Sequence, residues 1–146
     1  CPLTEIKVGT GRRLHDGWDV AVLSIGPIGN DVEKAIRLIE SAESPATKHH
    51  CPSVAHYDMR FLKPLDENLL EEVASRFSRI VTIEDGVRNG GLGSAVTEWM
   101  NDHGYRPHIT RMGLPDSFVE QGTVRQLWEI CGIDVESIKR QLTVDR

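Results

Sequence analysis

The sequence predicts an α/β fold of three layers, in which a mostly parallel sheet of about five strands lies between helices. Short apolar segments such as residues 20–25 and 80–83 have the continuous hydrophobicity of strands that are covered on both faces. Segments with apolar residues at helical spacing follow these strands along the chain. Strands that alternate with helices are typical of parallel sheets built through right-handed crossovers.

Five helices are expected; one follows the glycine-rich loop described below, and a residue suited to the N-cap precedes three of the other four. Asn30 and Glu33 resemble a capping box, Asp66 suits an N-cap, and Thr123 with Gln126 forms a second capping box. The last helix is expected from about residue 135 to 142. The apolar stripes of the three helices with a predicted N-cap are Val32, Ala35, Ile36 and Ile39; Leu69, Leu70, Val73, Ala74 and Phe77; and Val124, Leu127, Trp128 and Cys131.

The chain is expected to form one domain, residues 19–146, preceded by an N-terminal arm, residues 1–18. Residues 5–8 and 12–18, joined through two turn glycines, read as a short extended arm or an irregular hairpin. Further strands are expected at residues 53–58 and 108–112. Because the sequence opens at Cys1 without an initiator Met, we expect it to be a piece of a longer protein.

Composition limits the classes of partner and the cellular setting. Seventeen basic and twenty-two acidic residues give a net charge of −5 without a long run of either sign, which argues against nucleic-acid and anionic-membrane partners. No apolar stretch approaches a membrane span or a signal-peptide core, so a cytoplasmic setting is expected. Cys1, Cys51 and Cys131 are an odd and widely spaced set, which fits reduced thiols.

The stretch from residue 80 to 100 reads as a strand, an acidic turn, a glycine-rich loop and the opening of a helix. Ser94 suits the N-cap of that helix. Free amides at the helix terminus, with Arg88 nearby, could hold a phosphate or carboxylate. The alternative that we favour is close packing, with the acidic pair capping amides or meeting a basic group. The residues concerned are Glu84, Asp85, Arg88, Gly90, Gly91, Gly93 and Ser94.

A larger side chain at Gly91 is expected to clash at positive φ and to damage folding or assembly. Glu84 and Asp85 could also act as a general-base pair, but no His, Ser or Lys follows at a spacing that would activate a nucleophile. We therefore favour a structural or interface role for them. Further interface candidates are Arg60, Lys63, Asp66, Asp116 and Phe118.

Neither a metal site nor a catalytic residue is predicted. His49, His50, Cys51 and His56 carry zinc-ligand chemistry, yet adjacent histidines rarely bind one ion and no Cys-x-x-Cys or His-Glu-x-x-His is present. A polar surface loop is the favoured interpretation.

Three segments together resemble one enzyme family. Residues 60–66 read Arg-Phe-Leu-Lys-Pro-Leu-Asp, residues 82–85 lead into Gly-Gly-Leu-Gly-Ser-Ala-Val, and residues 113–122 begin Gly-Leu-Pro-Asp-Ser-Phe. In this order they look like the C-terminal domain of 1-deoxy-D-xylulose-5-phosphate synthases, over about residues 19–138. The glycine motif is shared with transketolases and with 2-oxo-acid dehydrogenase E1 β subunits. The family usually has Glu and Asn where Asp85 and Gly86 stand, and residues 44–52 are atypical.

The resemblance implies a cytoplasmic, homodimeric, thiamine-diphosphate enzyme that joins pyruvate to glyceraldehyde 3-phosphate for isoprenoid, thiamine and pyridoxal synthesis. Thiamine diphosphate and Mg²⁺ would be bound by preceding domains, so no catalytic, cofactor or metal residue is expected here and the isolated chain would be inactive. This domain would serve dimer assembly, with a proposed regulatory site near its glycine turn. A stand-alone binding or assembly module is the alternative of another class.

Overall fold

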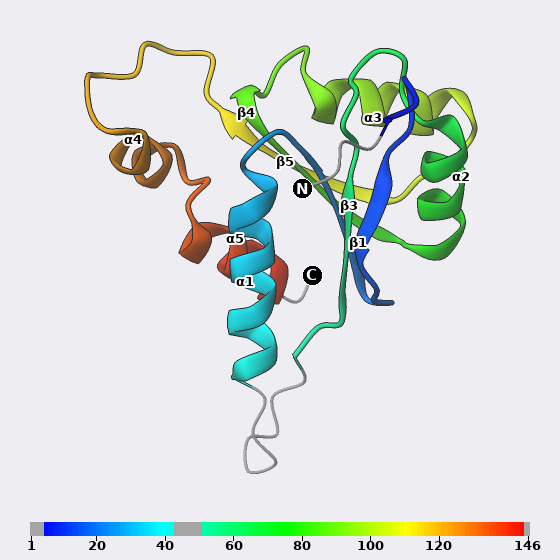
Figure 1. The fold of residues 1–146 in the computed structure, drawn as a ribbon, viewed down its shortest axis with the longest axis horizontal. Coiled ribbons are helices and arrows are strands. Elements are labelled where there is room, and N and C mark those ends of the chain that lie inside the picture. The colour runs from blue at the N-terminus through cyan, green and yellow to red at the C-terminus, as the bar shows by residue number, and fades with distance from the viewer. Residues whose placement is uncertain (1–4, 43–50, 145–146) are drawn as a thin grey trace.

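The computed structural model describes residues 5–42 and 51–144, and in that part of the chain five strands form one sheet of order β1-β3-β2-β4-β5 (Figure 1). β1 pairs antiparallel with β3, and all other neighbours are parallel. The mostly parallel sheet of about five strands is thus confirmed. The strands are β1 (Arg12–His15), β2 (Val20–Ile25), β3 (Val54–Asp58), β4 (Arg79–Val87) and β5 (His108–Leu114).

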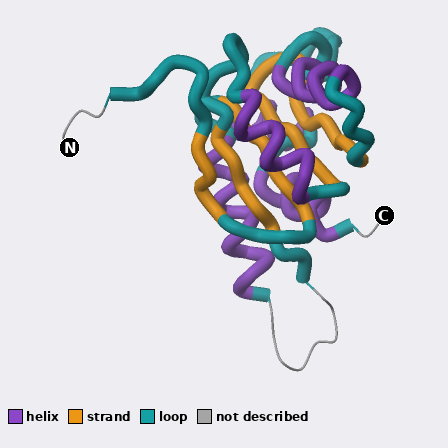
Figure 2. The backbone as a smooth tube through the Cα atoms, turned by 90° about the vertical axis from the view of Figure 1, so that its right-hand side faces the viewer, coloured by secondary structure: helices purple, strands orange, loops and turns teal. Residues whose placement is uncertain are grey.

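Helices cover both faces of the sheet, which gives the predicted three layers (Figure 2). One face carries α1 (Gly29–Ser41) and α5 (Val135–Thr143), with α4 (Val124–Cys131) at the margin of this layer. The other face carries α2 (Glu67–Arg76) and α3 (Leu92–Asp102). Side chains of β2 alternate between the two cores: Val20 and Val22 face α1, while Ala21 and Leu23 face α2 and α3.

The predicted helix starts have different outcomes. Asp66 caps α2 by accepting a hydrogen bond from the Leu69 amide at 3.1 Å, and the Thr123 capping box of α4 is present. The capping box at Asn30 is wrong, because α1 already begins at Gly29 and no side chain caps it. The predicted stripe of α1 is buried throughout.

Helix α4 departs from its pattern. Its apolar residues have helical spacing, yet none is buried, and Val124 is 62% exposed. Trp128 and Cys131 pack partly against the core of the α1 face. Figure 1 shows α4 at the left of the view, set apart from the sheet and below the long segment that follows β5.

The N-terminal arm does not form the expected hairpin. β1 pairs with β3, with Arg12 opposite Asp58 and Arg13 opposite Tyr57, and residues 5–8 lie in no strand. The hairpin alternative is wrong because β1 pairs with the edge of β3 instead, and an Arg12–Asp58 ion pair of 3.1 Å supports this register. The division at residue 18 stays a prediction.

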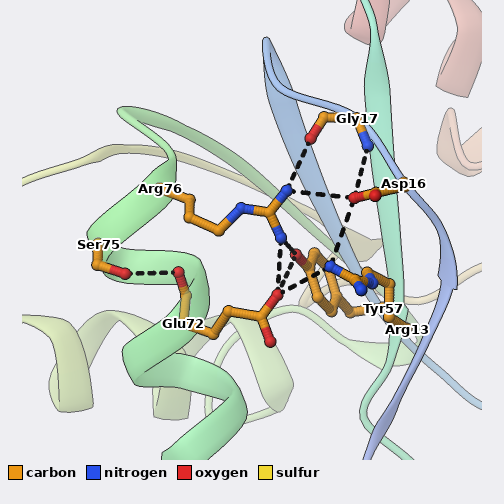
Figure 3. A network of polar contacts seen from close by, with 7 residues as sticks. All are labelled: Arg13, Asp16, Gly17, Tyr57, Glu72, Ser75 and Arg76. Carbon is orange, nitrogen blue, oxygen red and sulfur yellow. Dashed lines mark hydrogen bonds and ion pairs between the residues drawn. The ribbon is translucent and has the colours of Figure 1, made fainter.

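Arg76 holds the end of the arm against α2 and β3 (Figure 3). Its guanidinium donates hydrogen bonds to Glu72 at 2.7 Å, to Tyr57 Oη at 3.1 Å, to Asp16 at 3.2 Å and to the Gly17 carbonyl at 3.1 Å. The planar fork of Arg suits this many acceptors, whereas Lys would meet fewer. One side chain therefore joins three segments that are distant in the sequence.

The remaining predictions on thiols and membranes concern only part of the chain. Cys51 and Cys131 are free thiols, and Cys1 lies outside the described residues. In residues 5–42 and 51–144, the helices are too short or too polar to cross a bilayer.

Arg76→Ala should loosen the arm without unfolding the sheet. Because Arg76 is partly exposed, solvent screening limits its contribution to about 1 kcal/mol, and Tm should fall by about 3–4 °C in thermal circular dichroism. Arg125→Ala, which removes an exposed pair with Glu129 in α4, is the control and should change Tm by less than half as much. Equal shifts for the two variants would show that Arg76 has no special role.

Candidate functional site

The candidate site lies where the carboxyl ends of β2 and β4 meet. β2 has β3 on one side and β4 on the other, so the chain crosses from one side of β2 to the other after β3. Such a switch point is where open α/β sheets bind ligands. Ile25 and Glu84 are paired at this position.

Glu84 is buried at this edge, with 6% of its surface exposed. Its Oε2 accepts a hydrogen bond from the Leu92 amide at 2.9 Å, and its Oε1 accepts one from the Gly93 amide at 3.0 Å. Strand alternation places Glu84 on the same face as Ile80, directly beneath the start of α3. Two amides and the positive end of the helix dipole therefore stabilise the carboxylate.

The predicted N-cap at Ser94 is wrong. Helix α3 begins at Leu92 with Gly91 in the N-cap position, because Glu84 caps the first turn from another element. The Ser94 hydroxyl instead accepts hydrogen bonds from the Gly90 amide at 2.9 Å and from Arg111 Nη1 at 3.0 Å. Ser94 thus closes the glycine loop on itself.

The glycines make room for this carboxylate. A Cβ on Gly91 would lie 1.8 Å from Glu84 Oε2, and a Cβ on Gly93 would lie 2.7 Å from Thr82 Oγ1. The expected positive φ at Gly91 is wrong, since its φ is −91° and the positive φ of the loop is at Gly90. Close approach to Glu84 explains Gly91.

Glu84 and Asp85 make contacts on opposite faces of the sheet. Asp85 points away from α3, and its Oδ1 accepts a hydrogen bond from Trp128 Nε1 in α4 at 3.1 Å. The prediction of an acidic turn is wrong, because β4 continues through both residues and Val87 still pairs with Leu114. Capping of amides is confirmed for Glu84, whereas Asp85 bonds an indole.

Some of the other predicted site residues are exposed to solvent, and others make contacts within the domain. Arg88, Lys63 and Asp116 are exposed, and Phe118 is 96% exposed. Both carboxylate oxygens of Asp66 are hydrogen-bonded within the domain: one accepts from the Leu69 amide and the other, at 2.8 Å, from the Gly11 amide. Arg60, Lys63, Asp116 and Phe118 all follow strands at the carboxyl edge, where Glu84 also lies.

A buried relay of Ser24, His56 and Glu33 was not predicted. His56 Nε2 lies 2.8 Å from Ser24 Oγ, and its Nδ1 contacts Glu33 Oε1. Burial lowers the pKa of His56, and this outweighs the opposing effect of Glu33. The neutral tautomer that satisfies both partners donates from Nδ1 to Glu33 and accepts from the Ser24 hydroxyl.

The order of groups in the relay matches a nucleophile, a base and an orienting carboxylate. Its burial argues for a structural role, because Ser24 is 1% exposed and none of the cavities found among the described residues is lined by it. A Cβ on Gly29 would lie 2.9 Å from Ser24 Oγ, so α1 packs directly on the hydroxyl. A histidine between Ala55 and Tyr57 in a buried strand was the available signal.

The zinc-ligand residues do not assemble in the described part of the chain. His56 is engaged by Ser24 and Glu33, and His49 and His50 lie outside the described residues. Residues 5–42 and 51–144 contain no cluster of three metal-ligand side chains.

Comparison with known proteins decides the family. The model of the transketolase C-terminal domain matches residues 9–138. The chain belongs to the transketolase C-terminal domain family. It is 55% identical over 142 residues to the 1-deoxy-D-xylulose-5-phosphate synthase of Bacteroides thetaiotaomicron and 54% identical over 146 residues to that of Bacteroides fragilis. These matches cover 97% and 100% of the chain but 21% and 22% of the relatives, so it spans about a fifth of their length.

Solved structures agree with this transketolase C-terminal fold. A structure titled "Split gene transketolase, inactive beta4 tetramer" has a TM-score of 0.81 and 27% identity, and the match covers 97% of this chain and 45% of that one. The transketolase of Leishmania mexicana, with a TM-score of 0.59 and 15% identity, supports the fold alone; 95% of this chain and 19% of that one are covered.

Gly91→Ala should destabilise this transketolase C-terminal domain far more than Gly90→Ala. The new Cβ would displace Glu84 from two amides, and losing charge-assisted hydrogen bonds in a buried site costs about 3 kcal/mol. Gly90 has open space around it, so its replacement costs about 1 kcal/mol for the left-handed backbone alone. Urea unfolding measures both, and a larger loss for Gly90→Ala would contradict the packing explanation.

The relay should make stability depend on pH. The unfolded chain takes up a proton on His56 near the ordinary pKa of 6.5, whereas the folded domain takes it up only at lower pH. The resulting contribution of neutral His56 to the free energy of unfolding is complete above pH 6.5. It is lost as the pH falls from 6.5 toward the lowered pKa. His56→Asn should therefore flatten the fall in the urea midpoint between about pH 7 and pH 5. His103→Asn, outside the relay, should keep the wild-type slope; parallel lines for all three proteins would refute the prediction.

Proposed function

We propose that this chain is the C-terminal domain of a synthase that condenses pyruvate with glyceraldehyde 3-phosphate to give 1-deoxy-D-xylulose 5-phosphate and CO2. The product would serve isoprenoid, thiamine and pyridoxal synthesis in the cytoplasm. Support comes from relatives of 40% to 55% identity that carry this synthase name and match over nine-tenths or more of the chain. The rest of the parent protein would supply the catalytic centre.

The domain would act in assembly rather than in chemistry. The observation that supports this role is the bonding of Glu84. Its buried carboxylate at the switch point accepts hydrogen bonds from the Leu92 and Gly93 amides. A group already bonded to two amides is poorly placed to activate substrate. The residues of this edge that reach solvent, among them Arg88 and Phe118, would contact neighbouring domains or a regulatory anion.

Thiamine diphosphate and Mg²⁺ do not fit the described residues of this chain. A diphosphate bound through Mg²⁺ needs oxygen ligands that are free to coordinate. Glu84 is committed to amides, Asp85 to Trp128, and the described part of the chain offers no group of three metal-ligand side chains. Both cofactors are therefore assigned to preceding domains of the parent enzyme.

Docking and self-association are supported by the unburied helix α4. Val124 and Ile130 are exposed, and a groove of about 1100 Å³ runs between α1 and the α4–α5 segment. Apolar surface of this kind marks interaction sites. The split-gene transketolase structure is named as a beta4 tetramer, and we propose that the parent enzyme of this chain also self-associates, as a homodimer.

The test uses the full-length parent protein, assayed for 1-deoxy-D-xylulose 5-phosphate from pyruvate and glyceraldehyde 3-phosphate with thiamine diphosphate and Mg²⁺. Phe118→Ser should weaken dimerisation and activity about tenfold or more, because a fully desolvated aromatic anchor contributes at least that much. Trp18→Ser, at the opposite edge of the sheet, should leave both unchanged.

Four results would change this proposal. A full-length protein without synthase activity would refute the proposed reaction, and transketolase activity or capture of a lipoyl-bearing partner would replace it with the related alternatives. Equal effects of Phe118→Ser and Trp18→Ser would refute the assembly role of this edge. Synthesis of the chain as an independent protein would favour a stand-alone module.

A further inference from the structure

Arg60 has an unusual backbone conformation. Its φ is +56°, and among residues 5–42 and 51–144 every other positive φ belongs to glycine. An L-residue with a Cβ pays a steric cost in this region that glycine does not. Such outliers gather at functional positions, where the surrounding structure holds them in place.

The turn after β3 holds this conformation. Asp58 Oδ1 accepts a hydrogen bond from the Arg60 amide at 3.1 Å, and the Phe61 amide donates to the Met59 carbonyl at 2.5 Å. Neither contact uses the Arg60 side chain. Glycine at this position could make the same backbone contacts with less strain.

Inside the domain, the Arg60 guanidinium gains little. Its Nε lies 3.9 Å from Asp58 Oδ2, at the limit of an ion pair. That oxygen already accepts a hydrogen bond from Arg12 Nε at 3.1 Å. Only 25% of the Arg60 side chain is exposed, yet its terminal amino groups make no hydrogen bond or ion pair with the described residues. Polar contacts within the domain therefore do not explain why an Arg occupies this left-handed position.

The position of Arg60 indicates the chemistry of a partner. It follows β3 at the carboxyl edge, next to Leu62 and Lys63, which are exposed. Asp58 pairs with both Arg12 and Arg60, so Arg60 shares its carboxylate with a second cation. A planar guanidinium in this setting suits bidentate binding of a carboxylate.

We propose that Arg60 binds an Asp or Glu side chain on a preceding domain of the same protein and so fixes how this domain docks. The proposal rests on the proposed function in one respect, because it requires that further domains exist. It adds the chemistry of the contact and the residue that makes it.

Zero-length cross-linking of the full-length protein tests the contact. Arg60→Lys places an amine at this position, and a water-soluble carbodiimide then joins amines to carboxylates within contact distance. Peptide mapping should find the new amine linked to an acidic residue outside these 146 residues. Lys63, a native amine in the same segment, gives the background in wild type and variant. Linkage of the new amine to Asp58 alone, or to no acidic residue at all, would overturn the proposal.

Arg60→Gly provides a second measurement, since it removes the side chain and relieves the backbone. Amide hydrogen exchange at residues 58–66 of the full-length protein should be about tenfold faster than in wild type, as expected for loss of a charged hydrogen-bonded pair. Arg60→Lys should restore part of the protection. Unchanged or slower exchange in Arg60→Gly would overturn the proposal, while synthase activity of the wild-type protein reports separately on the proposed reaction.

Discussion

The carboxylate of Glu84 determines how β4, the glycine loop and α3 fit together. Its two bonds to the Leu92 and Gly93 amides fix where α3 starts, and α3 then covers one face of the sheet. The same bonds explain the absence of a Cβ at Gly91, and Gly113 on β5 would contact the Glu84 stem at 3.1 Å if it carried one. A sequence that looks like an anion-binding loop therefore supplies its own anion from the preceding strand.

Periodicity was sufficient for the layers of the fold. The continuous apolar run of β2 and the stripe of α1 predicted a buried central strand and a covering helix, and both are present. Local chemistry also placed the caps at Asp66 and Thr123. Pairing between distant segments could not be predicted from the sequence. β1 could pair with residues 5–8 or with the edge of β3, and the choice depends on which strand edge is unpaired in the folded sheet.

The candidate site was predicted in place but not in detail. The sequence indicated that Glu84 and the glycines belong together, while the opposite directions of Glu84 and Asp85 follow from β4 extending to Val87. Ser24, Glu33 and His56 lie on three elements, and their contact depends on tertiary packing that no local motif records. Site residues that are close in the sequence could thus be predicted, whereas residues that only the folded sheet brings together could not.

Helix α4 has a further consequence for dynamics. It buries no residue, and its links to the domain are the Asp85–Trp128 hydrogen bond and partial packing of Trp128 and Cys131. Regions with few buried apolar contacts open at a lower free energy than the global unfolding transition. We therefore expect α4 to open at a lower free energy than the sheet, and a partner that covers Val124 and Ile130 would couple the order of α4 to assembly.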